Sequence, residues 1–121
     1  MPVPILKQGD TLIVTVQASL NDAELSTLRQ ELAERVGRQR IKGLVIDVSA
    51  LDVLDSFASR TLVGIAKVSG LRGAEAVIVG IQPEVAFAMV QLGLKLEGVE
   101  TALDLEEGLI KLEALKRAAL R

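Results

Sequence analysis

Two short apolar runs constrain the fold of this chain more than any other feature of its sequence. They are "LVIDV" at residues 44–48 and "AEAVIVGI" at residues 74–81. Runs with so few polar residues are typical of strands covered on both faces of a sheet. The segment between them, "DSFASRTLVGIAKVSGLRG", has the apolar spacing of a helix and closes on Gly70 and Gly73. Strand, helix and strand in this order predict a parallel pair in an α/β sheet.

The N-terminal part of the chain adds a strand pair and a helix. Ile5-Leu6 and Thr11–Val16 are apolar runs on either side of Gly9-Asp10, which is a turn signal. They predict a β-hairpin or two adjacent antiparallel strands. Apolar residues then recur at spacings of three and four, as on one face of an amphipathic helix. These residues are Leu25, Leu28, Leu32 and Val36.

Residues at helix ends mark two of the predicted helices. Asn21 or Asp22 can cap the first helix, and Gly37 suits its C-terminal end. Pro83 stands at the natural first position of a later helix, which Gly93 ends. The apolar residues of that later helix are Val85, Phe87, Ala88 and Val90.

The C-terminal region predicts a brief strand at residues 98–102 and a last helix from near Asp104. We expect that helix to bury a stripe of leucines against the sheet, namely Leu105, Leu109, Leu112 and Leu115. Basic residues gather toward its C-terminal end, where the helix dipole favours them, namely Lys111, Lys116, Arg117 and Arg121. The whole order is β-β-α-β-α-β-α-β-α. We therefore predict an α/β fold with a mixed, mostly parallel sheet and packed helices, in a single domain over residues 1–121.

Composition removes several classes of function. The 121 residues include no cysteine and no histidine, which excludes disulfides, thiolate or imidazole metal ligands, and Ser–His or Cys–His catalysis. A net charge of −2 and only two aromatic residues argue against a nucleic-acid partner. No secretory signal opens the chain, and no apolar run approaches the roughly 20 residues that span a bilayer. We expect a cytoplasmic location, no membrane partner, and a binding or regulatory role.

The pair Asp55-Ser56 stands where a loop runs into the predicted helix, and it admits two interpretations. Aspartate and serine at a helix start commonly cap the free N–H groups. Alternatively, the Ser56 hydroxyl accepts a phosphate, which those amides and the helix dipole stabilise. Asp52 and Asp55 would repel the phosphate, so we expect a changed surface potential that breaks a docked contact. Ser59 and Thr61 are secondary candidates, and helical spacing places Ser59 near the face of Ser56.

Three carboxylates admit a different chemistry. Asp47, Asp52 and Asp55 could form a Mg²⁺ cluster or a general acid/base pair, with Asp47 best placed near a strand end. No residue nearby supplies a nucleophile or a cradle for a substrate. A doubly wound nucleotide-binding fold needs a glycine-rich turn after a strand. This sequence lacks one, because Gly70–Gly73 follows a helix rather than a strand. We therefore expect no catalytic residue, no metal and no cofactor.

Three stretches resemble a known family: "PILKQGDTLIV", "VIDVSALDVLDSF" and "VIVGIQPEVAFAMVQLGLKLEGVETALDLEEGL". With the element order and Asp55-Ser56 after the third strand, they resemble STAS domains, named for sulfate transporters and anti-sigma-factor antagonists. The resemblance covers essentially the whole chain and is closest to the stressosome scaffold branch. It implies that Ser56 is the phosphoacceptor and Asp55 its motif neighbour. The motif continues Phe57-Ala58-Ser59 instead of the Ser/Thr-Gly-Leu of simple antagonists, which favours the scaffold branch.

The resemblance also implies partners. Proteins of this branch form a large assembly with RsbR-like STAS paralogues and sequester a serine/threonine kinase of the RsbT type. Phosphorylation releases the kinase, and a PP2C-like phosphatase resets the system. We expect the surface around Ser56 and Arg60 to meet the kinase, and no sensory domain in this chain. The alternatives are a free anti-sigma-factor antagonist, which size would distinguish, and a small metal-dependent hydrolase.

Overall fold

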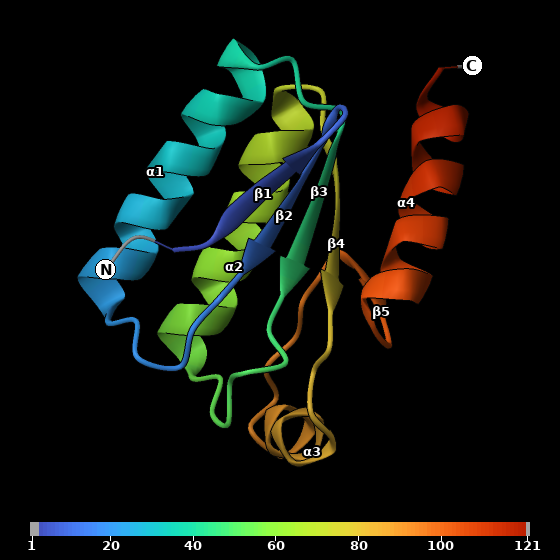
Figure 1. Ribbon diagram of the computed structural model, residues 1–121. Coiled ribbons are helices and arrows are strands. Elements are labelled where there is room, and N and C mark those ends of the chain that lie inside the picture. The colour runs from blue at the N-terminus through green and yellow to red at the C-terminus, as the bar shows by residue number, and fades with distance from the viewer. Residues whose placement is uncertain (1–2, 121) are drawn as a thin grey trace.

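The computed structural model describes residues 3–120, which form one sheet with helices around it (Figure 1). The elements in chain order are β1 Ile5–Gln8, β2 Thr11–Thr15, α1 Asp22–Arg38, β3 Gly43–Asp47, α2 Ser56–Leu71, β4 Glu75–Val79, α3 Pro83–Gln91, β5 Glu100–Ala102 and α4 Leu105–Ala119. This order confirms the prediction from the sequence, and Gly9-Asp10 forms the hairpin turn. Arg121, which the sequence assigned to the last helix, lies outside the described residues.

The five strands lie side by side in chain order, so that β1 and β5 form the two edges of the sheet. β1 pairs antiparallel with β2, and every other neighbouring pair is parallel. The predicted mixed, mostly parallel sheet is therefore confirmed. Successive crossovers step in one direction, so right-handed connections place α1 and α2 on the same face. α4 covers the opposite face, and α3 lies beyond the carboxyl ends of the parallel strands (Figure 1).

Alternation of side chains along the central strands divides the core into two layers. The larger layer lies between the sheet and the helices α1 and α2. Its strand residues include Leu12, Val14, Leu44, Ile46 and Ile78, and the predicted α1 stripe is buried in it. The smaller layer lies under α4 and contains Ile13, Val45, Val77, Val79 and Leu112. Burial on both faces explains why these strands carry nearly continuous apolar runs.

α4 packs on the sheet through a glycine and one leucine more than through the predicted leucine stripe. Gly108 faces Val79 so closely that a Cβ would collide with the valine side chain, and Leu112 lies against Gly43. Two half-buried leucines flank this contact, Leu109 and Leu115. The predicted burial of Leu105 is wrong, because this residue is 37% exposed. It belongs to the first turn of α4, which lies beside the loop that follows β4 rather than over the strand itself.

The two ends of α1 compare differently with the prediction. Asn21 caps the helix as expected, because its side chain accepts a hydrogen bond from the Glu24 amide at 2.8 Å and the Glu24 carboxylate accepts one from the Asn21 amide at 3.0 Å. Gly37 does not end the helix, which runs past it, and Arg40 takes the left-handed position at φ 53°. The missing side chain of Gly37 instead makes room for the Arg72 guanidinium, which a Cβ would meet.

α3 begins at Pro83 and ends shortly before Gly93, as predicted. One of its faces is buried, through Val85 and Met89, but Phe87 and Val90 are exposed. The apolar spacing indicated the helix but not its burial, because α3 lies beyond the ends of the strands and not on a face of the sheet.

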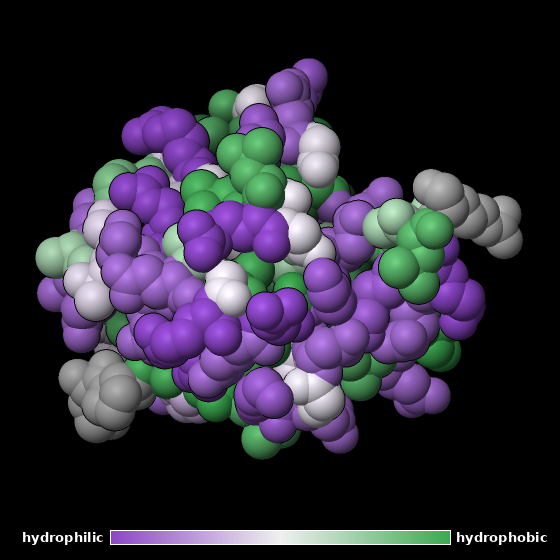
Figure 2. Space-filling view, turned by 90° about the horizontal axis from the view of Figure 1, so that it is seen from above, coloured by the Kyte–Doolittle hydropathy of each residue, from purple (hydrophilic) through white to green (hydrophobic). Residues whose placement is uncertain are grey.

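The opposite end of the molecule, seen from above in Figure 2, is mostly hydrophilic, with apolar residues showing between polar ones.

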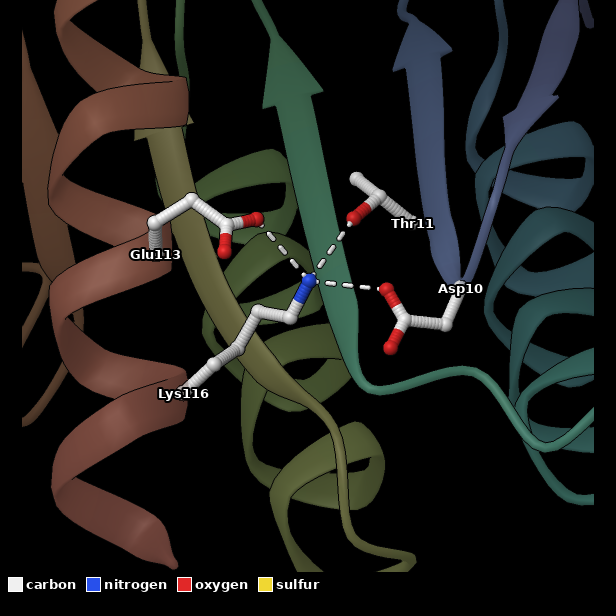
Figure 3. A network of polar contacts seen from close by, with 4 residues as sticks. All are labelled: Asp10, Thr11, Glu113 and Lys116. Atoms are coloured by element: carbon white, nitrogen blue, oxygen red, sulfur yellow. Dashed lines mark hydrogen bonds and ion pairs between the residues drawn. The ribbon is translucent and has the colours of Figure 1, made fainter.

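A polar network ties the C-terminal part of α4 to the hairpin turn (Figure 3). The Lys116 ammonium donates hydrogen bonds to Asp10 Oδ1 at 2.7 Å, to Glu113 Oε1 at 3.0 Å and to Thr11 Oγ1 at 3.4 Å. The hydrogen bond from Lys116 lowers the pKa of Asp10. Burial acts to lower the pKa of Lys116, but its hydrogen bonds to Asp10 and Glu113 outweigh burial and raise it.

This network predicts that stability falls in acid. A carboxyl whose folded-state pKa lies below its usual value of 3.8 stabilises the fold above that pH and loses this contribution as the pH falls through the folded-state pKa. Asp10→Asn should lower the free energy of unfolding at neutral pH by less than about 1 kcal/mol, because the Asp10 side chain is 50% exposed. Toward about pH 3 the difference from the parent chain should shrink. Urea unfolding of both proteins between neutral pH and about pH 3 measures this difference in the free energy of unfolding. A difference that stays constant with pH would contradict the stabilising role of the ionised Asp10.

Candidate functional site

The loop after β3 delivers Ser56 to the start of a helix. Asp55 caps α2, because its backbone is extended at φ −80° and ψ −179° and its carboxylate accepts a hydrogen bond from the Ala58 amide at 2.8 Å. The Asp55 carbonyl accepts another from the Ser59 amide at 2.9 Å. Ser56 is thus the first helical residue and not the cap. The capping interpretation applies to Asp55, and the Ser56 hydroxyl is not needed for it.

Burial separates the three candidate hydroxyls of α2. Ser56 is exposed, whereas Ser59 and Thr61 are 3% and 2% exposed. The Thr61 hydroxyl donates a hydrogen bond to the Phe57 carbonyl at 2.9 Å. The Ser59 hydroxyl is buried and finds no partner within the part of the chain that the structure describes. Of the three, only Ser56 can be reached by another protein without a rearrangement of α2.

The acidic residues considered as a metal or acid/base site are engaged separately. Asp47 Oδ1 accepts a hydrogen bond from the Ser49 amide at 2.9 Å. The Gln82 side chain donates to the Ser49 carbonyl at 2.7 Å and to Asp52 Oδ1 at 3.4 Å, a connection that the sequence did not predict. Asp55 caps α2. Among residues 3–120 no group of three or more acidic side chains is placed to hold a metal ion, so this site is not assembled.

Ser56 lies at one end of a groove of about 520 Å³ between α2 and the segment that follows α3. The residues that line the groove are Ser56, Ser59, Arg60, Val63, Lys67, Gly93, Leu94, Lys95 and Glu97. Three of them are cationic and one is anionic. Arg60 follows Ser56 by one helical turn, so the sequence could place it nearby. Lys95 comes from a distant part of the chain, and no local pattern pointed to it.

The part of the chain that holds this site matches a known protein family. Over residues 3–108 the chain matches the family model of the STAS domain. The chain belongs to the STAS family. Its match begins before β1 and ends within α4, so it includes α2, the groove and all five strands of the sheet. In the residues that the structure describes, no helix of this STAS domain has both the length and the apolar character needed to cross a membrane.

Relatives of this STAS domain include stressosome proteins. A serine-to-glutamate variant of RsbS from Moorella thermoacetica is 40% identical, with a TM-score of 0.81 over 97% of this chain and 99% of that one. A chain in the structure of the stressosome is 42% identical, with a TM-score of 0.79 over 94% of this chain and 99% of that one. The RsbT co-antagonist protein RsbRD of Bacillus subtilis is 24% identical over 110 residues, which are 90% of this chain and 40% of that protein. These likenesses confirm the predicted resemblance to the stressosome branch.

Proposed function

We propose that this STAS domain is a non-enzymatic, cytoplasmic scaffold subunit of a stressosome that holds an RsbT-type serine/threonine kinase until Ser56 is phosphorylated. The observation that carries the proposal is the position of Ser56, which is an exposed hydroxyl in the first turn of α2. Asp55 supplies the cap, so the hydroxyl can be modified without loss of the helix start. The likeness to RsbS and to a stressosome chain over nearly the whole length supports this role.

The partners of the proposal follow from the same relatives. A relative named as an RsbT co-antagonist matches 90% of this chain, which supports co-assembly with RsbR-like STAS paralogues and a common interaction with an RsbT-type kinase. A PP2C-like phosphatase completes the cycle by removing the phosphate. The complete absence of cysteine and histidine, and the separated carboxylates of the β3–α2 loop, support a binding role and not catalysis by this chain.

The proposed modification is a simple phosphoryl transfer. The Ser56 oxygen attacks the γ-phosphorus of ATP, the new O–P bond forms as the bond to ADP breaks, and the hydroxyl proton leaves to a base of the kinase. The phosphatase removes the group by a separate hydrolysis, in which water attacks the phosphorus, the O–P bond to Ser56 breaks, the hydroxyl is restored and inorganic phosphate leaves. The modified helix start carries about −1.5 to −2 charges that it lacked before. A kinase docked on the first turn of α2 would have to accommodate that charge and bulk, so its affinity falls.

A free anti-sigma-factor antagonist is the rival role within the family. The sequence after Ser56 favours the scaffold, because Phe57-Ala58-Ser59 replaces the pattern of the simple antagonists. The two roles differ in size. A scaffold subunit mixed with RsbR-like paralogues should elute from a sizing column as a very large complex, whereas an antagonist should remain a monomer or dimer.

Mass spectrometry of the intact chain, with mapping of the modified residue, tests the proposal. The chain is incubated with ATP and the RsbT-type kinase of the same organism. We expect the mass of one added phosphate, located on Ser56, and none on the buried Ser59 or Thr61. A chain without phosphate, or with phosphate only on Ser59 or Thr61, would overturn the assignment of Ser56.

A further inference from the structure

Two features of the groove beside Ser56 suit an anionic group. Ser59, which lines it, has a hydroxyl that is buried and finds no hydrogen-bond partner from residue 3 to residue 120. Ser69 on the same helix also has a buried hydroxyl without a partner among the described residues, but only Ser59 lines the groove, so its hydroxyl is available to a group placed there. Ser59 follows Ser56 by three residues, so the two side chains are neighbours on the surface of the helix.

The second feature is an excess of positive charge. Arg60, Lys67 and Lys95 line the groove against a single carboxylate, Glu97. None of the three cations forms an ion pair in the described part of the chain. The ion pairs there are made by Lys111 and Lys116 with acidic residues outside the groove. The groove therefore offers free cations on both walls, Arg60 on α2 and Lys95 on the segment after α3.

The acidic residues near Ser56 lie outside this groove. Asp55 turns its carboxylate to the Ala58 amide, and Asp52 accepts a hydrogen bond from Gln82. Neither residue lines the groove. Since the groove carries three cationic side chains against one carboxylate, and Asp52 and Asp55 lie outside it, electrostatics favours a phosphate on Ser56 that turns into the groove.

We propose that the phosphate on Ser56 turns into this groove, where Arg60 and Lys95 pair with its oxygens and the Ser59 hydroxyl donates a hydrogen bond to it. A guanidinium suits this role because it can bind two phosphate oxygens at once. The bridge joins α2 to residues 94–97, the segment that follows α3. The role of this bridge in signalling rests on the proposed function; the bridge itself can be tested apart from it.

The test places phosphoserine at position 56 during translation, so that it does not depend on any kinase. A ³¹P NMR titration then measures the second pKa of the phosphate, which is about 6 for a phosphoserine free of such partners. In the folded STAS domain we expect this pKa to be lower by on the order of one unit, because cations favour the dianion. Arg60→Ala and Lys95→Ala should each raise it toward the usual value, and Lys7→Ala, on β1 and outside the groove, should leave it unchanged.

Each outcome decides the inference. A lowered pKa that both groove variants raise supports the bridge. A pKa near the usual value, or a lowered pKa that Arg60→Ala or Lys95→Ala leaves unchanged, overturns it, because the phosphate then does not join α2 to the segment after α3. Both substituted side chains are exposed, so the variants should fold. Failure of the kinase to modify Ser56 in the mass measurement would instead count against the proposed function and leave this titration interpretable.

Discussion

Ser56→Ala is expected to abolish phosphate uptake and to keep the RsbT-type kinase bound in the presence of ATP. The reason is geometric, because the other two hydroxyls of α2 are buried and Thr61 already donates to a backbone carbonyl. The variant should fold normally. Asp55 provides the cap, so the loss of an exposed hydroxyl should change the free energy of unfolding by no more than about 0.5 kcal/mol.

The measurement is a pair of assays on the same preparation, radiolabelled phosphate uptake and retention of the kinase on the immobilised STAS domain. Thr61→Val is the matched control, since it removes a hydroxyl from the same helix outside the groove, keeps the buried volume, and should still allow phosphorylation and release. Ser56→Asp should release the kinase only in part, because one carboxylate carries less charge than a phosphate. Release of the kinase from Ser56→Ala after addition of ATP would show that another residue controls the contact.

Leu112→Ala is expected to cost about 2–5 kcal/mol of the free energy of unfolding, the range for truncation of a fully buried leucine. Leu112 fills the layer between α4 and the sheet, where it joins Val77 and Val79 and lies against Gly43. Within residues 3–120, α4 is the one helix on this face of the sheet (Figure 1). The cost within this range is set by how far α4 settles into the cavity.

Urea unfolding followed by circular dichroism measures this loss. Ile110→Ala is the matched control, because Ile110 belongs to the same helix but is 66% exposed. It should change the free energy of unfolding by about 0.5 kcal/mol or less. Equal losses for the two variants would mean that α4 is held by something other than its buried face.

Short-range patterns in the sequence predicted the fold well, because each strand and helix has its own spacing of apolar residues. The apolar runs at residues 44–48 and 74–81 predicted buried strands, and the core has two layers that cover both faces of them. The errors concern helix positions that depend on a neighbour. Gly37 looked like a helix end, but it accommodates the guanidinium of Arg72, the residue that follows α2. Leu105 had the right spacing for burial, but the strand beneath α4 ends before that first turn.

For the candidate site too, local sequence predicted some features and missed those that depend on distant parts of the chain. The position of Ser56 at a helix start follows from local sequence, and the structure places it there. Ser59 and Thr61 precede the buried Leu62 and Ile65 by three and four residues, so helical spacing could have placed both hydroxyls on the packed side of α2. The Gln82 contact and the Lys95 wall of the groove join segments far apart in the chain, so only the folded structure brings them together.

The two edge strands determine how copies of this chain can pack together. β1 has four residues and includes Lys7, and β5 has only three residues. Short edge strands and an edge lysine are features that disfavour the pairing of one sheet with another. In a large assembly, each sheet is therefore expected to stop at the boundary of its own molecule. The contacts between subunits would then be made by side chains of helices and loops, and such contacts can separate and re-form without exchange of backbone hydrogen bonds.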